Sequence, residues 1–302
     1  MNPNFFIIGA PKTGTSSLAQ YLSEHEKVFF SHIKEPFYWC DDFGSAGHEF
    51  GVQHLSNYLA LFHGATEDHI AVGEGSTRYL RSKNAVKNIL EFNPDARFII
   101  MLRNPVDVVQ AYHMEQKYSL HEDVEDFEEA WRLQDKRQSG LCIPSSCSEP
   151  LFLQYGYVCK YADQLELIYS TVSADKVKVL IFDDFKADTL SVYKETLSFL
   201  GVDYDGREEF PVVNSAHKHR FKFLANLILS PPKILVPVVR TFRGWLINNR
   251  FPVIEAIKRR LNVKATRVKA SGELELELKE YFKDDVAKLS KMLNRDLTHW
   301  LK

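Results

Sequence analysis

The chain has 302 residues, 45% of them hydrophobic and 26% charged, and its formal net charge is −2 at pH 7. This composition is typical of a globular protein with a full core, and it fits one large domain over residues 1–302. A charge so close to zero provides no whole-molecule field for polyanions, so we expect no nucleic-acid partner. No apolar run is long enough to cross a bilayer, so we expect no transmembrane segment.

The cysteines and the first strand bear on the cellular compartment. Cys142 and Cys147 flank four residues and could pair, but four reduced thiols in a cytoplasmic protein are the simpler expectation. The spacing of the cysteines does not make a metal site. The first predicted strand begins at Phe5, which leaves no room for a signal peptide. The prediction is therefore a cytoplasmic location.

The first predicted element is a strand over 5–8, a fully apolar run that fits a buried parallel strand. Glycines and a proline then mark a turn over 9–14, which contains Lys12 and the first of several hydroxyl side chains. Apolar residues return at helical spacing from Ser16. A strand, a small polar loop and a helix together form an anion cradle, because the N–H groups and the dipole at the helix start favour negative charge.

Farther along, apolar runs rich in strand formers alternate with segments of helical periodicity. Strands are predicted at 27–31, 70–73, 97–102 and 176–182, and helices at 54–62, 83–92, from 105, 161–169, 189–200 and 273–293. This alternation predicts an α/β fold, a P-loop-NTPase-like parallel sheet flanked by helices, with a helical C-terminal region. Ligands of such sheets bind at the carboxyl ends of the strands, so the chemistry is expected in the loops that follow them.

Two regions near the C-terminus are amphipathic or basic. The residues of the last helix that we expect in the core are Leu274, Leu278, Tyr281, Val286, Leu289 and Leu293. The stretch 211–270 is basic, with a single acid, Glu255, and its prolines are expected to break it into short helices. It fits a lid over an anionic cofactor or a membrane-surface patch, and equally a solvated basic region packed by its apolar face.

The loop around Lys12 is not the P-loop of nucleotide triphosphatases, whose lysine follows the second glycine, because Lys12 precedes Gly14. The pattern Pro-Lys-x-Gly-Thr-x-x-Leu directly after the first strand resembles instead the 5′-phosphosulfate loop of sulfotransferases that use 3′-phosphoadenosine 5′-phosphosulfate (PAPS). A second motif, Leu-Arg-Asn-Pro-Val-Asp at 102–107, resembles the turn whose arginine binds the 3′-phosphate of PAPS in that family. A guanidinium offers a fixed fork of donors for a phosphate.

Further matches extend the resemblance over nearly the whole chain. They lie at 34–37, 73–76, 182–185 and 294–300, and they resemble the bacterial and heparan-sulfate-type branch of the PAPS-dependent sulfotransferase superfamily. The chain departs from that pattern at Ala111, where the family usually has a second 3′-phosphate ligand, a serine. It departs again at Gly75, where heparan-type enzymes often carry a lysine.

The resemblance implies a set of site residues. The 5′-phosphosulfate loop comprises Lys12, Thr13, Gly14, Thr15, Ser16 and Ser17, and the 3′-phosphate is bound by Arg103 with Lys218 and Arg220. Lys12 neutralises the departing phosphate, and the reaction needs no metal. Glu35 matches the glutamate that serves as general base, with Glu74 as the alternate base. Glu35 could also be a structural carboxylate paired with Lys34. The co-product is adenosine 3′,5′-bisphosphate.

The acceptor is inferred from charge alone. Asp41, Asp42, Glu35, Glu74 and the acidic run 122–129 lie in loops that could border the acceptor. They favour a neutral or cationic small molecule, such as an amine- or guanidine-bearing natural product, sulfated on a hydroxyl or a nitrogen. A carbohydrate O-sulfotransferase is the alternative.

Two other classes stay open at this stage. A P-loop-type kinase would use Asp183 and Asp184 to hold magnesium, but its lysine would be misplaced. A non-catalytic binding protein on a sulfotransferase scaffold is favoured only by Ala111. Binding of adenosine 3′,5′-bisphosphate without metal, against ATP with magnesium, distinguishes these classes.

Overall fold

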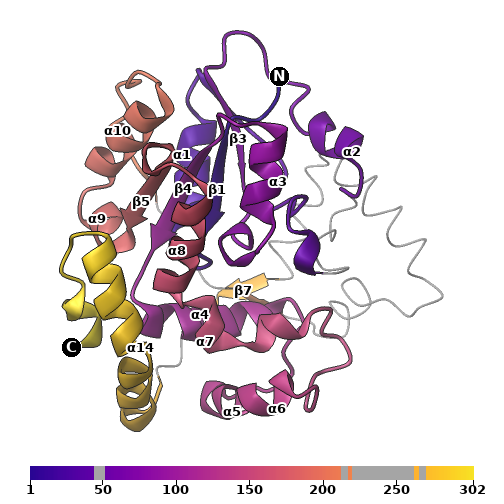
Figure 1. Ribbon diagram of the computed structural model, residues 1–302, viewed down its shortest axis with the longest axis vertical. Coiled ribbons are helices and arrows are strands. Elements are labelled where there is room, and N and C mark those ends of the chain that lie inside the picture. Colours follow the sequence, from indigo (N-terminus) through magenta and orange to yellow (C-terminus); the bar gives the residue numbers. More distant parts are fainter. Residues whose placement is uncertain (44–51, 212–216, 220–261, 265–269) are drawn as a thin grey trace. The chain divides into compact units, whose positions relative to one another are not determined.

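The computed structural model describes residues 1–43, 52–211, 217–219, 262–264 and 270–302 (Figure 1). The chain divides into two compact units, each built from separate stretches. The first comprises Met1–Val109, Gly156–Asn214 and Glu275–Lys302, and the second comprises Gln110–Tyr155 and Ser215–Leu274. Lys12, Glu35, Glu74 and Arg103 all belong to the first unit.

The first unit is organised around a parallel sheet. Its strands are β1 (Phe5–Gly9), β2 (Val28–Phe30), β3 (Ala71–Gly75), β4 (Arg97–Leu102) and β5 (Val177–Ile181), in the order β2-β3-β1-β4-β5. All four strand pairs are parallel, so every carboxyl end lies at one edge of the sheet. Chain order departs from sheet order on both sides of β1, which puts the crevice favoured by ligands beside the end of β1. The predicted α/β class is confirmed.

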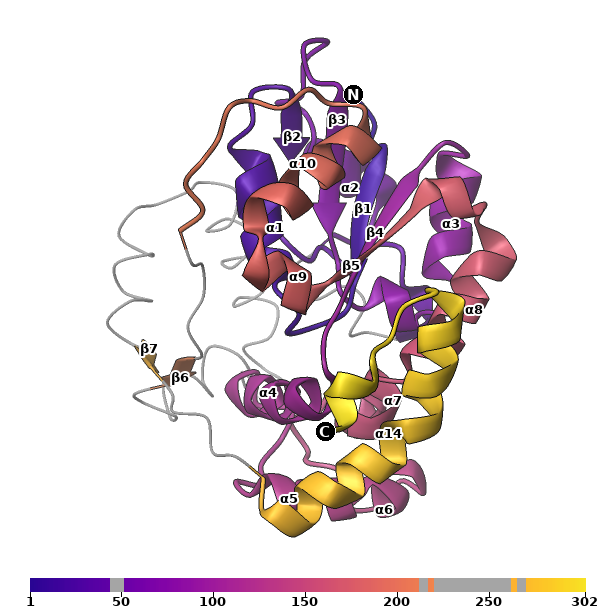
Figure 2. The same cartoon turned by 90° about the vertical axis from the view of Figure 1, so that its left-hand side faces the viewer.

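Helices cover both faces of this sheet (Figure 2). On one side lie α1 (Thr15–Ser23), α9 (Phe182–Ala187) and α10 (Thr189–Leu200), and on the other α3 (Ala85–Phe92) and α8 (Tyr161–Thr171). Alternate side chains of β1 lie on opposite faces of the sheet. Phe5 and Ile7 join the cluster with α1 and α10, whereas the Phe6 ring stacks on Phe98 with centroids 6.0 Å apart. The strands are apolar throughout because both faces are covered.

Two predicted strand ends were misplaced. We predicted that β3 ends at Gly73, but it continues through Glu74 to Gly75. Gly75 pairs with Ile7, and a Cβ at position 75 would lie 3.3 Å from the Phe30 ring, so this glycine permits close strand packing where we predicted a loop after the strand. At the other edge, Phe182 begins α9 instead of ending β5, and the two aspartates after it lie in the first helical turn.

The C-terminal helix α14 (Gly272–Met292) buries one stripe as expected, with two exceptions, one of which is Leu293, which lies beyond the helix end and is only partly buried. Tyr281 was predicted in the core but is 44% exposed, and its neighbour Phe282 is fully buried. Near the N-terminus of α8, the α14 residue Asp285 accepts hydrogen bonds from the backbone N–H groups of Tyr161 and Ala162 at 3.1 and 3.2 Å. Asp285 thus satisfies two of the donors that a helix start leaves unpaired.

The second unit contains most of α4 (Pro105–Tyr118), together with α5 (Phe127–Arg132), α6 (Gln134–Gln138) and the 3₁₀ turn η3 (Pro150–Leu153). Its centre is a fully buried ion pair in which Arg137 donates twice to Glu122, at 2.7 Å each, and Tyr155 donates to the same carboxylate. Removing one partner of such a pair would leave a buried charge uncompensated.

The basic stretch 211–270 is described in small part. Its described residues include two short antiparallel strands, β6 (His217–His219) and β7 (Asn262–Lys264), where we predicted short helices. Lys218 lies on β6. Arg220 and most of the predicted lid lie outside the described residues. No helix in the described part of the chain is long and apolar enough to cross a membrane.

Candidate active site

The loop after β1 is fixed to its neighbours by short backbone contacts. The N–H of Ala10 donates to Met101 O on β4 at 2.8 Å, and the Thr13 hydroxyl donates back to Ala10 O at 2.7 Å. Thr13 is fully buried, so its hydroxyl stabilises the loop conformation. Only the backbone N–H of Thr13 is a candidate for binding an anion. The loop therefore has a defined conformation before any ligand arrives.

Gly14 is the N-cap of α1 and has a left-handed φ of 91°. No side chain caps this helix end, and no acidic residue lies in its first turn. Thr15 is buried, while Ser16 and Ser17 in the same turn are half-buried. The first N–H groups of a nine-residue helix, with no acidic residue in their own turn, fit an anionic group of the size of a phosphate.

Lys12 lies in the middle of this loop. It is half-buried and has a φ of 62°, which a residue with a Cβ rarely adopts. Unfavourable backbone conformations of this kind persist where the surrounding structure holds them, and they concentrate at ligand sites. The loop thus places Lys12 two residues before the N-cap of α1, and its contact with a 5′-phosphosulfate stays a prediction.

Arg103 follows β4, the strand beside β1. Its side chain is only 12% exposed, donates to Asp107 at 2.7 Å, and lies over the Phe182 ring with 4.7 Å from Cζ to the ring centroid. The same ring lies under Gly14, where a Cβ would be 3.1 Å from two of its carbons. Phe182 therefore touches both the loop of Lys12 and the guanidinium of Arg103.

Glu35 occupies a tight turn after β2. Its backbone N–H donates to Gly75 O at 2.9 Å, which continues the strand pairing beside β3. One carboxylate oxygen lies 2.6 Å from Lys34 Nζ and the other accepts from the Thr77 hydroxyl at 2.9 Å. Burial alone would raise the pKa of Glu35, but the charges of Lys34 and Arg78 and these hydrogen bonds outweigh it and hold the pKa below its ordinary value.

Glu74 lies within β3 and is fully buried, not in a loop as we predicted. It accepts from the Ser76 hydroxyl at 2.7 Å, and the Tyr58 hydroxyl lies 3.5 Å from its other oxygen. Burial raises the pKa of Glu74 from its ordinary 4.5 to about 7. With no exposed face, Glu74 is poorly placed to meet an acceptor, which favours Glu35 as the base.

The comparisons with known proteins agree with this geometry. A family model described as the sulfotransferase domain matches residues 2–226. The crystal structure of a sulfotransferase from Alicyclobacillus acidocaldarius is similar, with a TM-score of 0.71 and 26% identity over 100% of both chains. The chain belongs to the sulfotransferase family. This membership confirms the enzyme class and the resemblance to the PAPS-dependent superfamily, whose sulfuryl donor is PAPS.

Curated relatives of this sulfotransferase match over shorter stretches. Human carbohydrate sulfotransferase 15 is 31% identical over 143 residues, which is 35% of this chain and 26% of that protein. Mouse bifunctional heparan sulfate N-deacetylase/N-sulfotransferase 4 is 26% identical over 204 residues, 66% of this chain and 22% of that protein. The matched part is therefore about a quarter of these relatives' length.

Several carboxylates that we placed on the acceptor side of the sulfotransferase are engaged elsewhere. Asp41 accepts from Asn84, Asp42 accepts from Ser82 and from the Lys83 N–H, and Glu122 is in the buried pair of the second unit. Together with the burial of Glu74, these contacts weaken the charge argument for a cationic acceptor. What remains of it is Glu35, which pairs with Lys34, and the other acids of the run 122–129.

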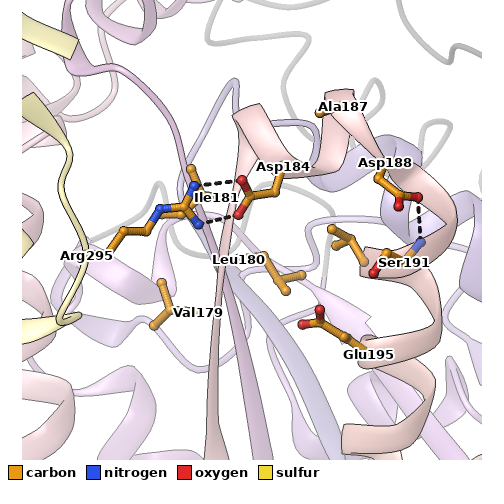
Figure 3. A pocket seen from close by; sticks show the side chains of 10 residues that line it. Val179, Leu180, Ile181, Asp184, Ala187, Asp188, Ser191, Glu195 and Arg295 are labelled. Carbon is orange, nitrogen blue, oxygen red and sulfur yellow. Dashed lines mark hydrogen bonds and ion pairs between the residues drawn. The ribbon is translucent and has the colours of Figure 1, made fainter. Parts of the chain in front are cut away.

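The aspartates that a kinase would need are also committed to protein partners. Arg295 donates to both oxygens of Asp184, and Asp183 accepts from Trp300 Nε1 at 2.7 Å and contacts His299 Nε2 at 3.1 Å. Figure 3 shows the Arg295–Asp184 pair at the rim of a pocket of about 420 Å³ beside β5. None of the residues of the Lys12 loop, nor Arg103, lines this pocket.

Two residues of the candidate site, Phe182 and Thr77, were not predicted from the sequence. The sequence predicted Phe182 as the last residue of a strand, and it gave no role to Thr77. Their contacts are with residues far away in the chain, Gly14 and Arg103 for one and Glu35 for the other. The only local signal was that both follow strands at the carboxyl edge of the sheet.

Proposed function

We propose that this enzyme transfers a sulfuryl group from PAPS to a hydroxyl, or to an amine- or guanidine-type nitrogen, of a small-molecule acceptor. The observation that carries the proposal is the uncapped N-terminus of α1 beside Lys12, joined through Phe182 to Arg103. PAPS supplies the sulfuryl group and carries phosphates at its 5′ and 3′ positions. The described residues fit it, because one anion cradle and one partly buried guanidinium lie at neighbouring strand ends.

Each residue has a role in this proposal. The amides from Thr13 to Ser17 bind the 5′-phosphate, and Lys12 stabilises the negative charge that develops on it. Arg103 binds the 3′-phosphate. Glu35 accepts the proton from the acceptor, and its lowered pKa keeps it ionised and ready at neutral pH. Lys218 and Arg220 remain proposed 3′-phosphate ligands on the resemblance alone.

The small-molecule acceptor, a natural product in our proposal, is supported by position 75. Heparan-type relatives often carry a lysine there, whereas here a side chain would meet Phe30 and Ile7 at 3.3 and 3.4 Å. The alternative, a carbohydrate O-sulfotransferase, is favoured by the names of the curated relatives. A cytoplasmic location is part of the proposal and is supported by four free cysteines.

Two measurements test this function. Calorimetric titration with adenosine 3′,5′-bisphosphate in EDTA should give tight binding, and ATP with magnesium should not compete. Radiolabelled PAPS is then offered with 2-naphthol, tyramine, agmatine, chondroitin and heparosan in parallel. Labelling of one of the three small molecules supports our acceptor class. Labelling of a polysaccharide alone would reject that class and leave the sulfotransferase assignment in place.

A further inference from the structure

The turn that carries Glu35 has an unusual backbone. Glu35 and Phe37 have φ values of 68° and 53°, on either side of Pro36. Two left-handed residues with side chains each cost on the order of 1–3 kcal/mol, so contacts from elsewhere must hold this turn. Such local strain is a reason to ask which residues fix the turn, and what they achieve by fixing it.

The contacts come from the end of β3 and the residues after it. Gly75 O accepts from the Glu35 N–H at 2.9 Å, and the Ser76 hydroxyl accepts from the Phe37 N–H at 3.2 Å. The Thr77 hydroxyl then reaches the Glu35 carboxylate itself at 2.9 Å. Three consecutive residues therefore bind the turn, two through its backbone and one through its functional group.

Thr77 differs from the other two in what it touches. Because Lys34 Nζ binds Oε1 of Glu35 and Thr77 Oγ1 binds Oε2, the carboxylate is held at both oxygens. Thr77 is buried, 6% exposed, so its hydroxyl has little freedom to turn elsewhere. We propose that Thr77 is a positioning residue for the general base, fixing the orientation of the Glu35 carboxylate toward the acceptor. This inference rests on the proposed function, in which Glu35 is the base.

Ser76 links the Glu35 turn to the buried Glu74. Its hydroxyl donates to the buried Glu74 at 2.7 Å while accepting from Phe37, so the turn is anchored to the interior of the sheet. Among the described residues, the charged groups that face Glu35 are Lys34, Arg78 and this Glu74, and Arg78 Cζ lies 3.8 Å from the centre of the Phe37 ring. Lys34 and Arg78 stabilise the Glu35 anion, and the Glu74 carboxyl opposes a second negative charge.

The donated hydrogen bond has a measurable electrostatic effect. A hydroxyl that donates to a carboxylate stabilises the ionised form and lowers its pKa. Removing the hydroxyl of Thr77 should therefore raise the pKa of Glu35 and leave fewer molecules with an ionised base at mildly acidic pH. A residue that merely fills space would not change this titration.

Thr77→Val removes the hydroxyl at nearly constant volume, and Thr77→Ser restores it. The titration of Glu35 is followed by ¹³C NMR in protein labelled at the glutamate carboxyl carbons, and the Glu35 resonance is assigned by its loss in Glu35→Gln. We expect the Glu35 pKa to rise in Thr77→Val and to return in Thr77→Ser. This reading needs no acceptor. Thr77→Ala carries the same expectation should Thr77→Val fail to fold.

Turnover with the best acceptor from the panel gives the second reading. In Thr77→Val, kcat should fall by about 10- to 100-fold, the value of one hydrogen bond to a charged group, with the dissociation constant of adenosine 3′,5′-bisphosphate unchanged. The acid limb of the kcat–pH profile should move to higher pH, and Thr77→Ser should reverse both effects. An unchanged Glu35 titration, or a loss of bisphosphate binding in step with kcat, would overturn the proposal. Full turnover in Glu35→Gln would instead reject the base itself, and would do so whatever Thr77→Val shows.

Discussion

At the scale of single residues, the proposed site depends on two cationic side chains, those of Lys12 and Arg103. Lys12 is half-buried in a left-handed conformation, and Arg103 rests on an aromatic ring with Asp107 at its edge. Asp107 is 53% exposed, so its pairing with Arg103 is screened by solvent and a phosphate can compete for the guanidinium. The binding of an anionic ligand by Lys12 and Arg103 stays a prediction.

Lys12→Ala tests the phosphosulfate loop. The variant should fold normally, because the lysine is not part of the core, but it should lose transfer activity by a factor of about 10² or more, as expected for one preorganised electrostatic donor. Activity is measured with radiolabelled PAPS and thermal unfolding checks the fold. Lys87→Ala, which removes an exposed lysine 70% accessible on α3, is the matched control and should behave like wild type. Comparable activities of the two variants would contradict the assignment.

Arg103→Ala tests the 3′-phosphate site. Truncating a partly buried charge that binds a phosphate costs on the order of 2–5 kcal/mol, so binding of adenosine 3′,5′-bisphosphate should weaken strongly. Binding of adenosine 5′-phosphosulfate, which lacks the 3′-phosphate, should weaken far less. Calorimetry with both ligands gives the ratio. An equal loss for the two would show that Arg103 supports the structure and does not read the 3′-phosphate, and Arg132→Ala on α5, 49% exposed, should alter neither.

At the scale of elements, the loop of Lys12 and the turn of Arg103 are joined through α9. Phe182, the first residue of α9, packs beneath Gly14 and under the guanidinium. The two strand-end loops thus share one contact, the ring of Phe182. This arrangement makes the glycine at the start of α1 a structural requirement as well as a sequence signature.

Gly14→Ala should weaken cofactor binding and lower stability together. Its Cβ would press on the Phe182 ring at 3.1 Å, and its φ of 91° is unfavourable for any residue but glycine. We expect a loss of stability on the order of 1–3 kcal/mol in chemical denaturation, with weaker binding of adenosine 3′,5′-bisphosphate. The control is Gly140→Ala, whose φ of 82° is similarly left-handed but whose Cβ would meet nothing within 4 Å. Equal bisphosphate affinity in the two variants would refute the role of Phe182.

The elements differ in how well their sequence predicted them. β4 and α10 were placed to the residue, because β4 is a continuous apolar run and α10 ends at Gly201 with a left-handed φ of 74°. The end of β3 was misread because its glycines serve close packing. Lys12 and Arg103 were identified as candidate site residues because they lie in loops that follow strands, and their roles stay predictions. Thr77 could not be predicted, because its role depends on a hydrogen bond across 42 residues of chain.

At the scale of the whole molecule, the carboxyl edge of the sheet is held by residues far away in sequence. In the first unit, Arg295 and Trp300 bind the two aspartates that follow β5, and Trp300 O accepts from Asn104 after β4 at 3.0 Å. The Asp183 pKa is lowered because hydrogen bonds from Trp300 and His299 outweigh the effect of burial. The C-terminal tail is therefore part of the frame that orients the turn carrying Arg103.

Two buried carboxyls, those of Glu74 and Asp285, have raised pKa values, and they make the stability of the protein depend on pH. Burial raises the pKa of Glu74 to about 7 and that of Asp285 from its ordinary 3.8 to about 6. Between the ordinary and the raised value, the folded protein holds a proton that the unfolded chain has released. Stability therefore falls as pH rises through about 4.5 to 7, by on the order of 3 kcal/mol for Glu74. Groups with lowered pKa values, such as Asp183 and Glu122, stabilise the fold when ionised, and this contribution is lost only as pH falls below their ordinary pKa values.

Glu74→Gln should flatten this dependence, because an amide holds the same place without a proton to lose. The midpoint of thermal unfolding is measured at pH 5 and pH 8 for wild type, Glu74→Gln and the exposed control Glu91→Gln, whose side chain is 67% accessible. Wild type and the control should lose more stability between the two pH values than Glu74→Gln does. Asp285→Asn should show a smaller effect in the same direction. Its raised pKa of about 6 is closer to pH 5 than that of Glu74, so less of its contribution is lost between pH 5 and pH 8. If Glu74→Gln kept the wild-type slope, the buried carboxyl beneath the Glu35 turn would be ionised at neutral pH. The Ser76 hydroxyl would then be anchored to a full negative charge, and the interior of the sheet would repel the base that this turn presents.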